Sequence, residues 1–254
     1  MYKLNFVQSV HLRGIANEKH DTKAVHEFIV DYWSEWFPAL PKYESYVKRV
    51  NNLSPAFRVL TQLLMNEQEL DATVLEHIID SLPIMVANSR RSGSAKVAPE
   101  MCDKGYCSSK NMWYYGVKLH SLSQKQYRSL PKPAMFGLTP ASVSDITFAK
   151  ENLCDFRNID VYGDKIYNDS DWFEYMRDYY NVNLVAPVKL KKGQEVLESI
   201  DRLYNSAVSS IRQPIESFFN WIIEKTHIQS ASKVRSSNGL LSFVFARLAV
   251  CFLF

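Results

Sequence analysis

Three acidic residues lie in apolar surroundings in this sequence. Asp80 stands inside the run HIIDSLPIMV (77–86), Asp164 directly follows the short apolar segment 159–163, and Glu216 lies among Ile and Phe residues of a helical segment. A carboxylate inside an apolar strand is costly unless something compensates its charge. Converging carboxylates repel one another unless divalent cations lie between them. Two such cations catalyse phosphoryl transfer on nucleic acids.

Each acid taken alone also has a structural explanation. Asp164 followed by Lys165 fits a simple loop turn, and Asp80 fits a cap on the following turn. Glu216 and Arg212 are four residues apart on one helix face, and such a surface ion pair contributes little to stability. The three acids are therefore informative only as a set that folding brings together.

Other polar residues are assigned structural roles. Asp145 and Asp169 are explained as residues that cap helix N-termini, and His120 as a hydrogen-bonded polar residue on a strand. The four cysteines do not form a metal-ligand pattern, and we interpret them as reduced thiols, which indicates a cytoplasmic protein.

Apolar periodicity predicts an α/β protein that is preceded by a helical region. Residues 1–76 are predicted to be all-helical, with helices over 24–36, 43–51 and 55–67. From residue 77 onward, short apolar strands alternate with helices, which implies a mixed sheet with helices on its faces. The predicted strands are 77–86, 113–122, 134–138, 159–163 and 183–188, and the predicted helices are 142–152, 169–179, 194–226 with a kink or break at Pro214, and a buried terminal helix from 240.

The order of these elements suggests where the acids lie. Asp80 and Asp164 are placed near the carboxyl ends of strands, where open α/β sheets carry their sites. Glu216 is on the helix that follows the last strand. We therefore expect the three carboxylates to converge at one edge of the sheet.

Composition is that of a globular protein. The chain has 254 residues, of which 46% are hydrophobic and 22% charged, and these values exclude a disordered or collagen-like chain. No signal peptide is recognised, and the apolar end 240–254 contains Arg247 and is too short to cross a bilayer comfortably. We expect no membrane association.

The net charge of +3 is small, but the basic residues are clustered. Between residues 90 and 118 there are six Lys or Arg and only two acids, and a second cluster follows the last predicted strand. Such clusters can bind phosphates, although a solvated surface is the ordinary explanation for any single lysine. The residues expected to contact DNA are Arg90, Arg91, Lys110, Lys118, Lys189, Lys191 and Lys192.

The segments around the acids resemble those of bacterial insertion-sequence transposases of the DDE type. The matching segments are IIDSLPI around Asp80, YGDKIYND around Asp164 and IRQPIESFFNW around Glu216, and 103–120 resembles the family's segment between the first two acids. The resemblance covers roughly residues 24–250. It implies a ribonuclease H-like catalytic domain over 77–254, preceded by a shortened DNA-binding region over 1–76.

The resemblance also implies roles for individual residues. Asp80, Asp164 and Glu216 would be catalytic and would hold two Mg²⁺ ions, with Mn²⁺ as a substitute. Arg212 matches the family's Arg one turn before the catalytic Glu, and Lys165 and Tyr167 match residues that follow the second Asp. The substrate would be double-stranded DNA, both transposon ends and target, and a homodimer holding two ends is the family expectation.

Two departures from the family leave alternatives open. First, the N-terminal region is shorter than in the family, and together with the apolar stop at Phe254 this suggests a truncated copy. Second, the family often has a Lys two turns after the catalytic Glu, whereas Lys225 lies nine residues after Glu216. An inactive copy that only binds DNA, and a nuclease without strand transfer, are the two functional alternatives. A structural domain with coincidental acids is a third.

Overall fold

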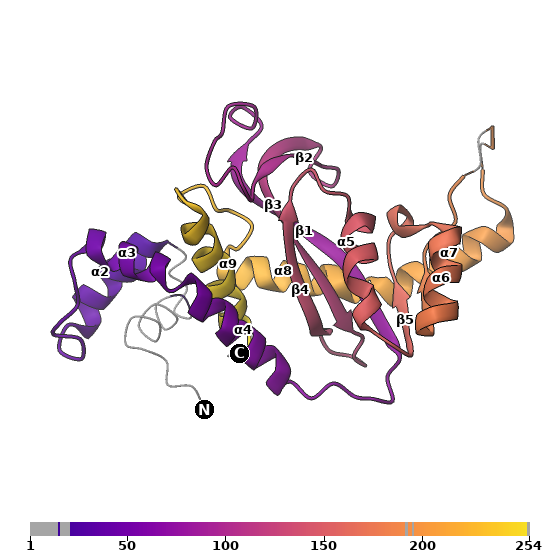
Figure 1. Cartoon of the computed structure of the whole chain (residues 1–254), viewed down its shortest axis with the longest axis horizontal. Coiled ribbons are helices and arrows are strands. Elements are labelled where there is room, and N and C mark those ends of the chain that lie inside the picture. The colour runs from indigo at the N-terminus through magenta and orange to yellow at the C-terminus, as the bar shows by residue number, and fades with distance from the viewer. Residues whose placement is uncertain (1–14, 16–20, 191–192, 195, 253–254) are drawn as a thin grey trace.

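The computed structural model describes residues 15, 21–190, 193–194 and 196–252. A mixed sheet stands at the centre with helices on both of its faces, and the described N-terminal helices extend from one end of the molecule toward the sheet (Figure 1). The predicted class, a mixed α/β fold with a helical N-terminal region, is confirmed.

The N-terminal helices are α2 (Thr22–Trp33), α3 (Tyr43–Asn52) and α4 (Ser54–Glu67). Asp21 caps α2 by accepting a hydrogen bond from the backbone N–H of Lys23. The buried residues of these helices pack against the C-terminal helix α9 (Ser237–Cys251), so the two ends of the described chain share a hydrophobic core. This core includes Val25, Ile29, Phe57, Ala246 and Val250.

Six strands form the sheet, in the order β2-β3-β1-β5-β6, with β4 also paired to β3. The first four strands pair antiparallel, whereas β5 is parallel to both β1 and β6. β2 was not predicted, because it is short and polar on one side. The strands are β1 (Glu76–Asn88), β2 (Asp103–Cys107), β3 (Met112–Gln124), β4 (Lys132–Pro140), β5 (Ile159–Tyr162) and β6 (Val182–Val185).

The sheet is covered on both faces because successive residues of β1 point to opposite sides. Ile78 and Leu82 pack with helices α8 (Pro214–Thr226) and α9. Ile79 packs on the opposite face with residues of α5 (Asp145–Asn152) and α6 (Ser170–Tyr180). Two short 3₁₀ helices, η1 (Leu153–Asp155) and η2 (Lys165–Tyr167), complete that layer. Figure 1 shows α5 and α8 on opposite sides of the sheet.

The long helix predicted over 194–226 is two helices. α7 (Ser199–Arg212) ends just before Pro214, and α8 begins at that proline. Proline lacks the N–H that an uninterrupted helix would use and fits the first turn of the next one, which explains the break. Within the described part of the chain, no helix is long and apolar enough to cross a membrane.

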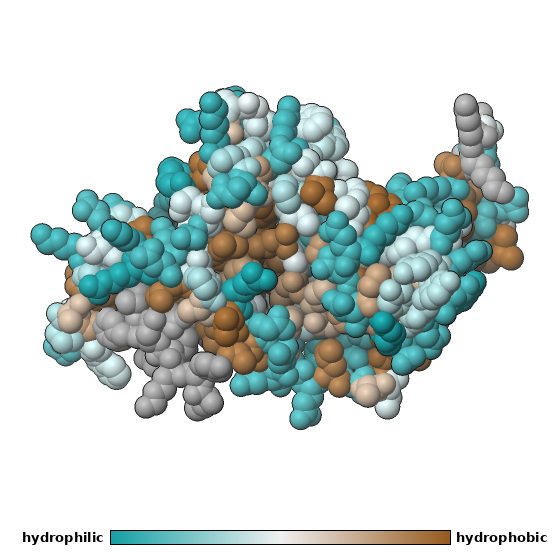
Figure 2. Space-filling model, in the orientation of Figure 1, coloured by the Kyte–Doolittle hydropathy of each residue, from teal (hydrophilic) through white to brown (hydrophobic). Residues whose placement is uncertain are grey.

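An apolar hollow lies between the N-terminal helices and the sheet. Hydrophobic side chains are visible there near the centre of the face in Figure 2. A cavity of about 250 Å³ is lined by Met65 of α4, Leu138 of β4 and Phe245 of α9. The helical region and the sheet are therefore joined through apolar contacts with α9.

Candidate active site

Asp80 and Asp164 both follow the parallel pairing of β1 with β5. The last aligned pair of these strands is Ile78 with Tyr162, and each acid follows its strand's member of that pair by two residues. We predicted that Asp80 lies near the carboxyl end of its strand. This prediction is wrong, because β1 continues along β3 to Asn88. Asp80 stands instead where the pairing with β5 stops. The expected convergence of all three carboxylates at this edge of the sheet stays a prediction.

Asp164 begins the short helix η2. Its Oδ1 accepts a hydrogen bond of 2.6 Å from the backbone N–H of Lys165. The preceding Gly163 has no room for a side chain, because a Cβ there would lie 2.6 Å from Cδ2 of Tyr167 and 3.3 Å from Cγ2 of Ile79. The sequence YGDKIY thus folds the Tyr167 ring underneath the residue that precedes Asp164. The turn proposed from the Asp164–Lys165 pair is present, and it holds the carboxylate near β1.

Arg212 connects the other two positions. Its Nη1 lies 3.1 Å from Oδ2 of Asp80, and its Nη2 lies 3.2 Å from Oε1 of Glu216. The Arg212 side chain is 17% exposed and that of Asp80 is 23% exposed, whereas Glu216 is 60% exposed. Arg212 therefore does more than form a surface ion pair with Glu216. It joins the helical carboxylate to the acid on β1.

The environment of Asp80 disfavours its charged form. Burial raises the pKa of Asp80 to about 6, although Arg212 and a hydrogen bond from the Ser81 N–H act in the opposite direction. The nearby acids Asp145 and Asp164 raise this pKa further, in that order. A carboxyl with such a raised pKa, beside other acids, is typical of functional sites.

Tyr167 is buried next to Gly163, and its hydroxyl has no partner in the described structure. The residue is 3% exposed. Burial raises the pKa of Tyr167 well above its ordinary value, and Asp145, Asp80 and Asp164 add to that shift. The phenol therefore keeps its proton. A buried donor without an acceptor is costly and calls for an explanation.

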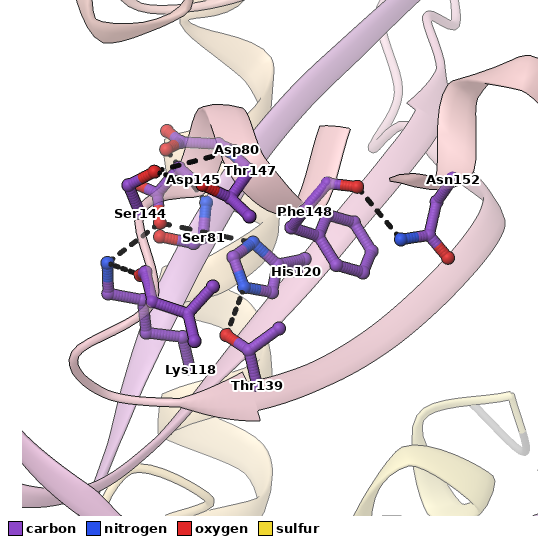
Figure 3. A network of polar contacts seen from close by, with 11 residues as sticks. Asp80, Ser81, Lys118, His120, Thr139, Ser144, Asp145, Thr147, Phe148 and Asn152 are labelled. Carbon is purple, nitrogen blue, oxygen red and sulfur yellow. Dashed lines mark hydrogen bonds and ion pairs between the residues drawn. The ribbon is translucent and has the colours of Figure 1, made fainter. Parts of the chain in front are cut away.

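A polar network on the other side of β1 contains Asp145, which sequence reasoning assigned to helix capping. The cap of α5 is Ser144, whose hydroxyl accepts from the Thr147 N–H, while Asp145 pairs with Lys118 at 2.9 Å. The network is drawn in Figure 3, where Asp145 lies between the Lys118 ammonium and the His120 ring, with Asp80 nearby. No local signal in the sequence links Asp145 to Lys118, because 27 residues separate them.

His120 and Asp169 also have definite surroundings. His120 is fully buried, stacks on Phe148 with ring centroids 4.0 Å apart, and uses Nε2 to bond the Thr139 hydroxyl. Its Nδ1 has no hydrogen-bond partner in the described structure. We expected a fully hydrogen-bonded histidine, and only one of the two ring nitrogens is hydrogen-bonded. Asp169 does cap a helix, since it accepts a hydrogen bond from the Trp172 N–H at the start of α6.

The predicted DNA-contacting residues are dispersed over several elements. Arg90 and Arg91 are exposed in the turn after β1, Lys189 is exposed after β6, and Lys165 is exposed beside Asp164. Lys110, in the turn between β2 and β3, bonds the side chain of Gln229. Lys118 is largely enclosed, because it donates to Asp145 and to the carbonyl of Val143. Lys191 and Lys192 lie outside the described residues.

The candidate cation site has suitable donors but is not assembled as a ligand cluster. Within the described ranges, no group of three His, Cys, Asp or Glu side chains is arranged to hold a metal ion. The donors are nonetheless carboxylate oxygens, which hard cations such as Mg²⁺ prefer. The unpaired hydroxyl of Tyr167 and the raised pKa of Asp80 fit the same chemistry, because a cation would offset the crowded negative charge.

The strand order and the helices on both faces of the sheet are those of a ribonuclease H-like fold. Comparison with known families agrees with this class. The family described as the transposase DDE domain matches residues 72–253, which is most of the chain. The chain belongs to this family of transposases, whose members are nucleic-acid-cleaving enzymes. No curated protein and no solved structure matches the chain.

Proposed function

We propose that the protein cleaves DNA at the ends of a transposable element and joins those ends to target DNA. The single observation that supports this proposal is the link from Asp80 through Arg212 to Glu216, beside a parallel strand pair whose last aligned residues stand two positions before Asp80 and Asp164. The family match supports it, because transposition is the activity of that family.

Asp80, Asp164 and Glu216 would hold two divalent cations, Mg²⁺ or Mn²⁺. When bound, such cations activate a water or a DNA 3′-hydroxyl and stabilise the leaving oxygen. Arg212 pairs with Oδ2 of Asp80 and with Oε1 of Glu216, so its guanidinium would share these two carboxylates with the cations. Tyr167 keeps its proton, so it can donate a hydrogen bond without adding charge.

The exposed basic residues would bind the phosphates of the DNA. Arg90, Arg91 and Lys189 are exposed and free to meet phosphates, and we include Lys110 and Lys165 with them. Lys118 could contact DNA only by leaving its pair with Asp145. We assign residues 1–76 as the DNA-binding part, 77–254 as the catalytic domain, a homodimer as the active assembly, and the bacterial cytoplasm with the nucleoid as the location.

Strand cleavage and joining test the proposal directly. The substrate is a duplex carrying the inverted repeat that flanks the reading frame, with Mg²⁺ and a target plasmid. We expect Asp80→Asn to lose cleavage and joining while it still binds the duplex. Asp160→Asn serves as the matched control, because Asp160 lies on β5 and its side chain accepts a hydrogen bond from Asn183.

Three results would contradict the proposal in different ways. Cleavage by Asp80→Asn at the wild-type rate would remove the acid from the mechanism. Cleaved ends without joined products in the wild type would indicate a nuclease. Binding of the duplex without cleavage would indicate an inactive copy.

A further inference from the structure

Two exposed aromatic side chains contact each other on the hairpin formed by β2 and β3. Tyr106 is 47% exposed and Trp113 is 51% exposed, and their ring centroids lie 5.3 Å apart. The two residues are cross-strand partners in the antiparallel pairing, so their side chains share one face of the sheet. The next residues, Tyr114 and Tyr115, are buried in the core. We call Tyr106 and Trp113 the hairpin pair.

The hairpin that carries this pair is fixed by core contacts. Gly105 has no room for a side chain, because a Cβ there would lie 2.8 Å from Cβ of Ala141. Cys107 and Tyr114 pack with Ala141 in one buried cluster on the inner face. Single exposed aromatic residues need no explanation, whereas grouped apolar side chains on a surface often mark an interaction site. The hairpin pair is such a group, and its backbone is held in place before any partner binds.

Positive charge accompanies the hairpin pair. The Nζ atom of Lys104 lies 4.7 Å from the centroid of the Trp113 ring. Lys110 is exposed in the turn between the strands, and the segment 89–102 after β1 lies at the same end of the sheet (Figure 1). Residues 89–113 hold five Lys or Arg and two acids. The exposed cations of the preceding segment are Arg90, Arg91 and Lys96. The pair is therefore suited to an anionic partner.

A second exposed aromatic pair shows that the rings alone do not identify the partner. Tyr175 and Tyr179 of α6 are 45% and 74% exposed, with ring centroids 5.0 Å apart. Helix α6 carries three acids and one arginine, so its surface is negative where that of the hairpin is positive. A polyanion with planar groups fits the hairpin pair and not the pair on α6. Nucleic acid has both properties.

The strand register places the hairpin pair away from the candidate active site. Asp80 is paired with Ser121, which lies eight residues after Trp113 on β3. Eight residues of a strand span roughly 26 Å. A contact at the hairpin pair therefore involves a part of the DNA distant from the reacting phosphate. Aromatic side chains beside cations bind single-stranded nucleic acid by stacking on bases, and the faces of bases inside an intact duplex are already covered.

We propose that the hairpin pair is a stacking platform for an unpaired base of a DNA strand, with Lys104 and the exposed cations after β1 binding the neighbouring phosphates. This inference rests on the proposed function, because DNA is taken as the partner. It depends neither on a cation nor on the three acids, so it can be tested without catalysis.

Binding of a labelled single-stranded thymidylate oligonucleotide to the full-length protein, followed by fluorescence anisotropy in EDTA, tests this inference. We expect Trp113→Ala to weaken binding by about fivefold or more, because stacking on the ring is lost. The slope of log K against log salt should stay unchanged in this variant, since no phosphate contact is removed. Lys104→Gln should instead reduce the slope by about 0.7 units.

Two further variants serve as controls for ring loss. Tyr179→Ala removes an exposed aromatic ring from α6 and should bind the oligonucleotide within about twofold of the wild type. Trp113→Phe keeps an aromatic ring and should retain most of the affinity. If Trp113→Ala does not fold, Tyr106→Ala replaces it with the same expected loss.

The outcomes separate this inference from the proposed function. Wild-type affinity for the oligonucleotide in folded Trp113→Ala, or in Tyr106→Ala where that variant replaces it, overturns the stacking role. An equal loss in Tyr179→Ala or in Trp113→Phe overturns it as well, as does the absence of single-strand binding by the wild type. Normal cleavage and joining by the wild type alongside any of these results would leave the proposed function in place. Weakened binding by Trp113→Ala without cleavage by the wild type would support the platform and contradict the proposed function.

Discussion

Arg212 and Asp80 form an ion pair of 3.1 Å although 132 residues separate them in the chain. The contact joins the last turn of α7 to the central strand β1. Because Arg212 also holds Glu216, the three residues form one partly buried charge cluster. This cluster is the point at which the helical layer is attached electrostatically to the sheet.

Removing this arginine should destabilise the fold. In Arg212→Ala, Asp80 would keep a partly buried charge without its partner, and we expect a loss of about 1–3 kcal/mol in the free energy of unfolding. Urea unfolding measures this change. Arg177→Ala is the control, since Arg177 forms an exposed pair with Asp178 and should change stability by less than about 1 kcal/mol. Equal losses of unfolding free energy in both variants would show that the contact with Asp80 stabilises the fold no more than an exposed ion pair does.

A methyl group at Gly163 should disturb the site. The added Cβ would lie 2.6 Å from the Tyr167 ring, so the ring or the backbone before Asp164 must move. We expect Gly163→Ala to cost about 1–3 kcal/mol of stability and to reduce DNA cleavage more than DNA binding. Gly93→Ala, which meets no atom within 4 Å, is the control. Normal cleavage and stability in Gly163→Ala would contradict the close packing described for this turn.

His120 should make the protein less stable in mild acid. Burial lowers the pKa of His120 to about 4, from 6.5 in the unfolded chain. As the pH falls below 6.5, the unfolded state binds a proton that the folded state does not, so stability is lost down to about pH 4. Between pH 7 and 5 the loss should be about 2 kcal/mol.

Asp80 acts in the opposite direction over nearly the same range. Its pKa is raised from 3.8 to about 6, so its contribution to stability is lost as the pH rises through that interval. The two variants to compare are therefore Asp80→Asn and Asp80→Asn with His120→Gln, by urea unfolding at pH 7 and pH 5. His77, whose pKa is also lowered by burial, is common to both. Equal acid sensitivity of the two variants would contradict the buried neutral state of His120.

The exposed arginines after β1 should control the salt dependence of DNA binding. Each phosphate contact contributes about one unit to the slope of log K against log salt. We expect Arg90→Ala with Arg91→Ala to reduce this slope by about two units, as measured by fluorescence anisotropy with a terminal-repeat duplex. Arg157→Ala with Arg177→Ala removes the same charge from the region of η1 and α6 and should leave the slope unchanged. A reduced slope in the Arg157 and Arg177 variant, with an unchanged slope in the Arg90 and Arg91 variant, would place the DNA on the surface near η1 and α6.

Much of the fold could be predicted from local pattern. The apolar run around Asp80, the alternation over 113–122 and the break at Pro214 each correspond to an observed element, namely β1, β3 and the junction of α7 with α8. β2 was missed because its five residues bury only Gly105 and Cys107, which leaves almost no apolar signal. The hairpin with β3 is formed by backbone pairing that composition does not reveal.

The sequence by itself determined most of the elements, though not β2, and which three acids resemble a DDE set, because periodicity and short motifs are local properties. Only the tertiary structure decided that Arg212 bridges Asp80 and Glu216, that Ser144 rather than Asp145 caps α5, and that Lys118 is enclosed. These contacts join residues up to 132 positions apart. Their formation depends on how strands pair and helices pack, and no local pattern encodes that arrangement.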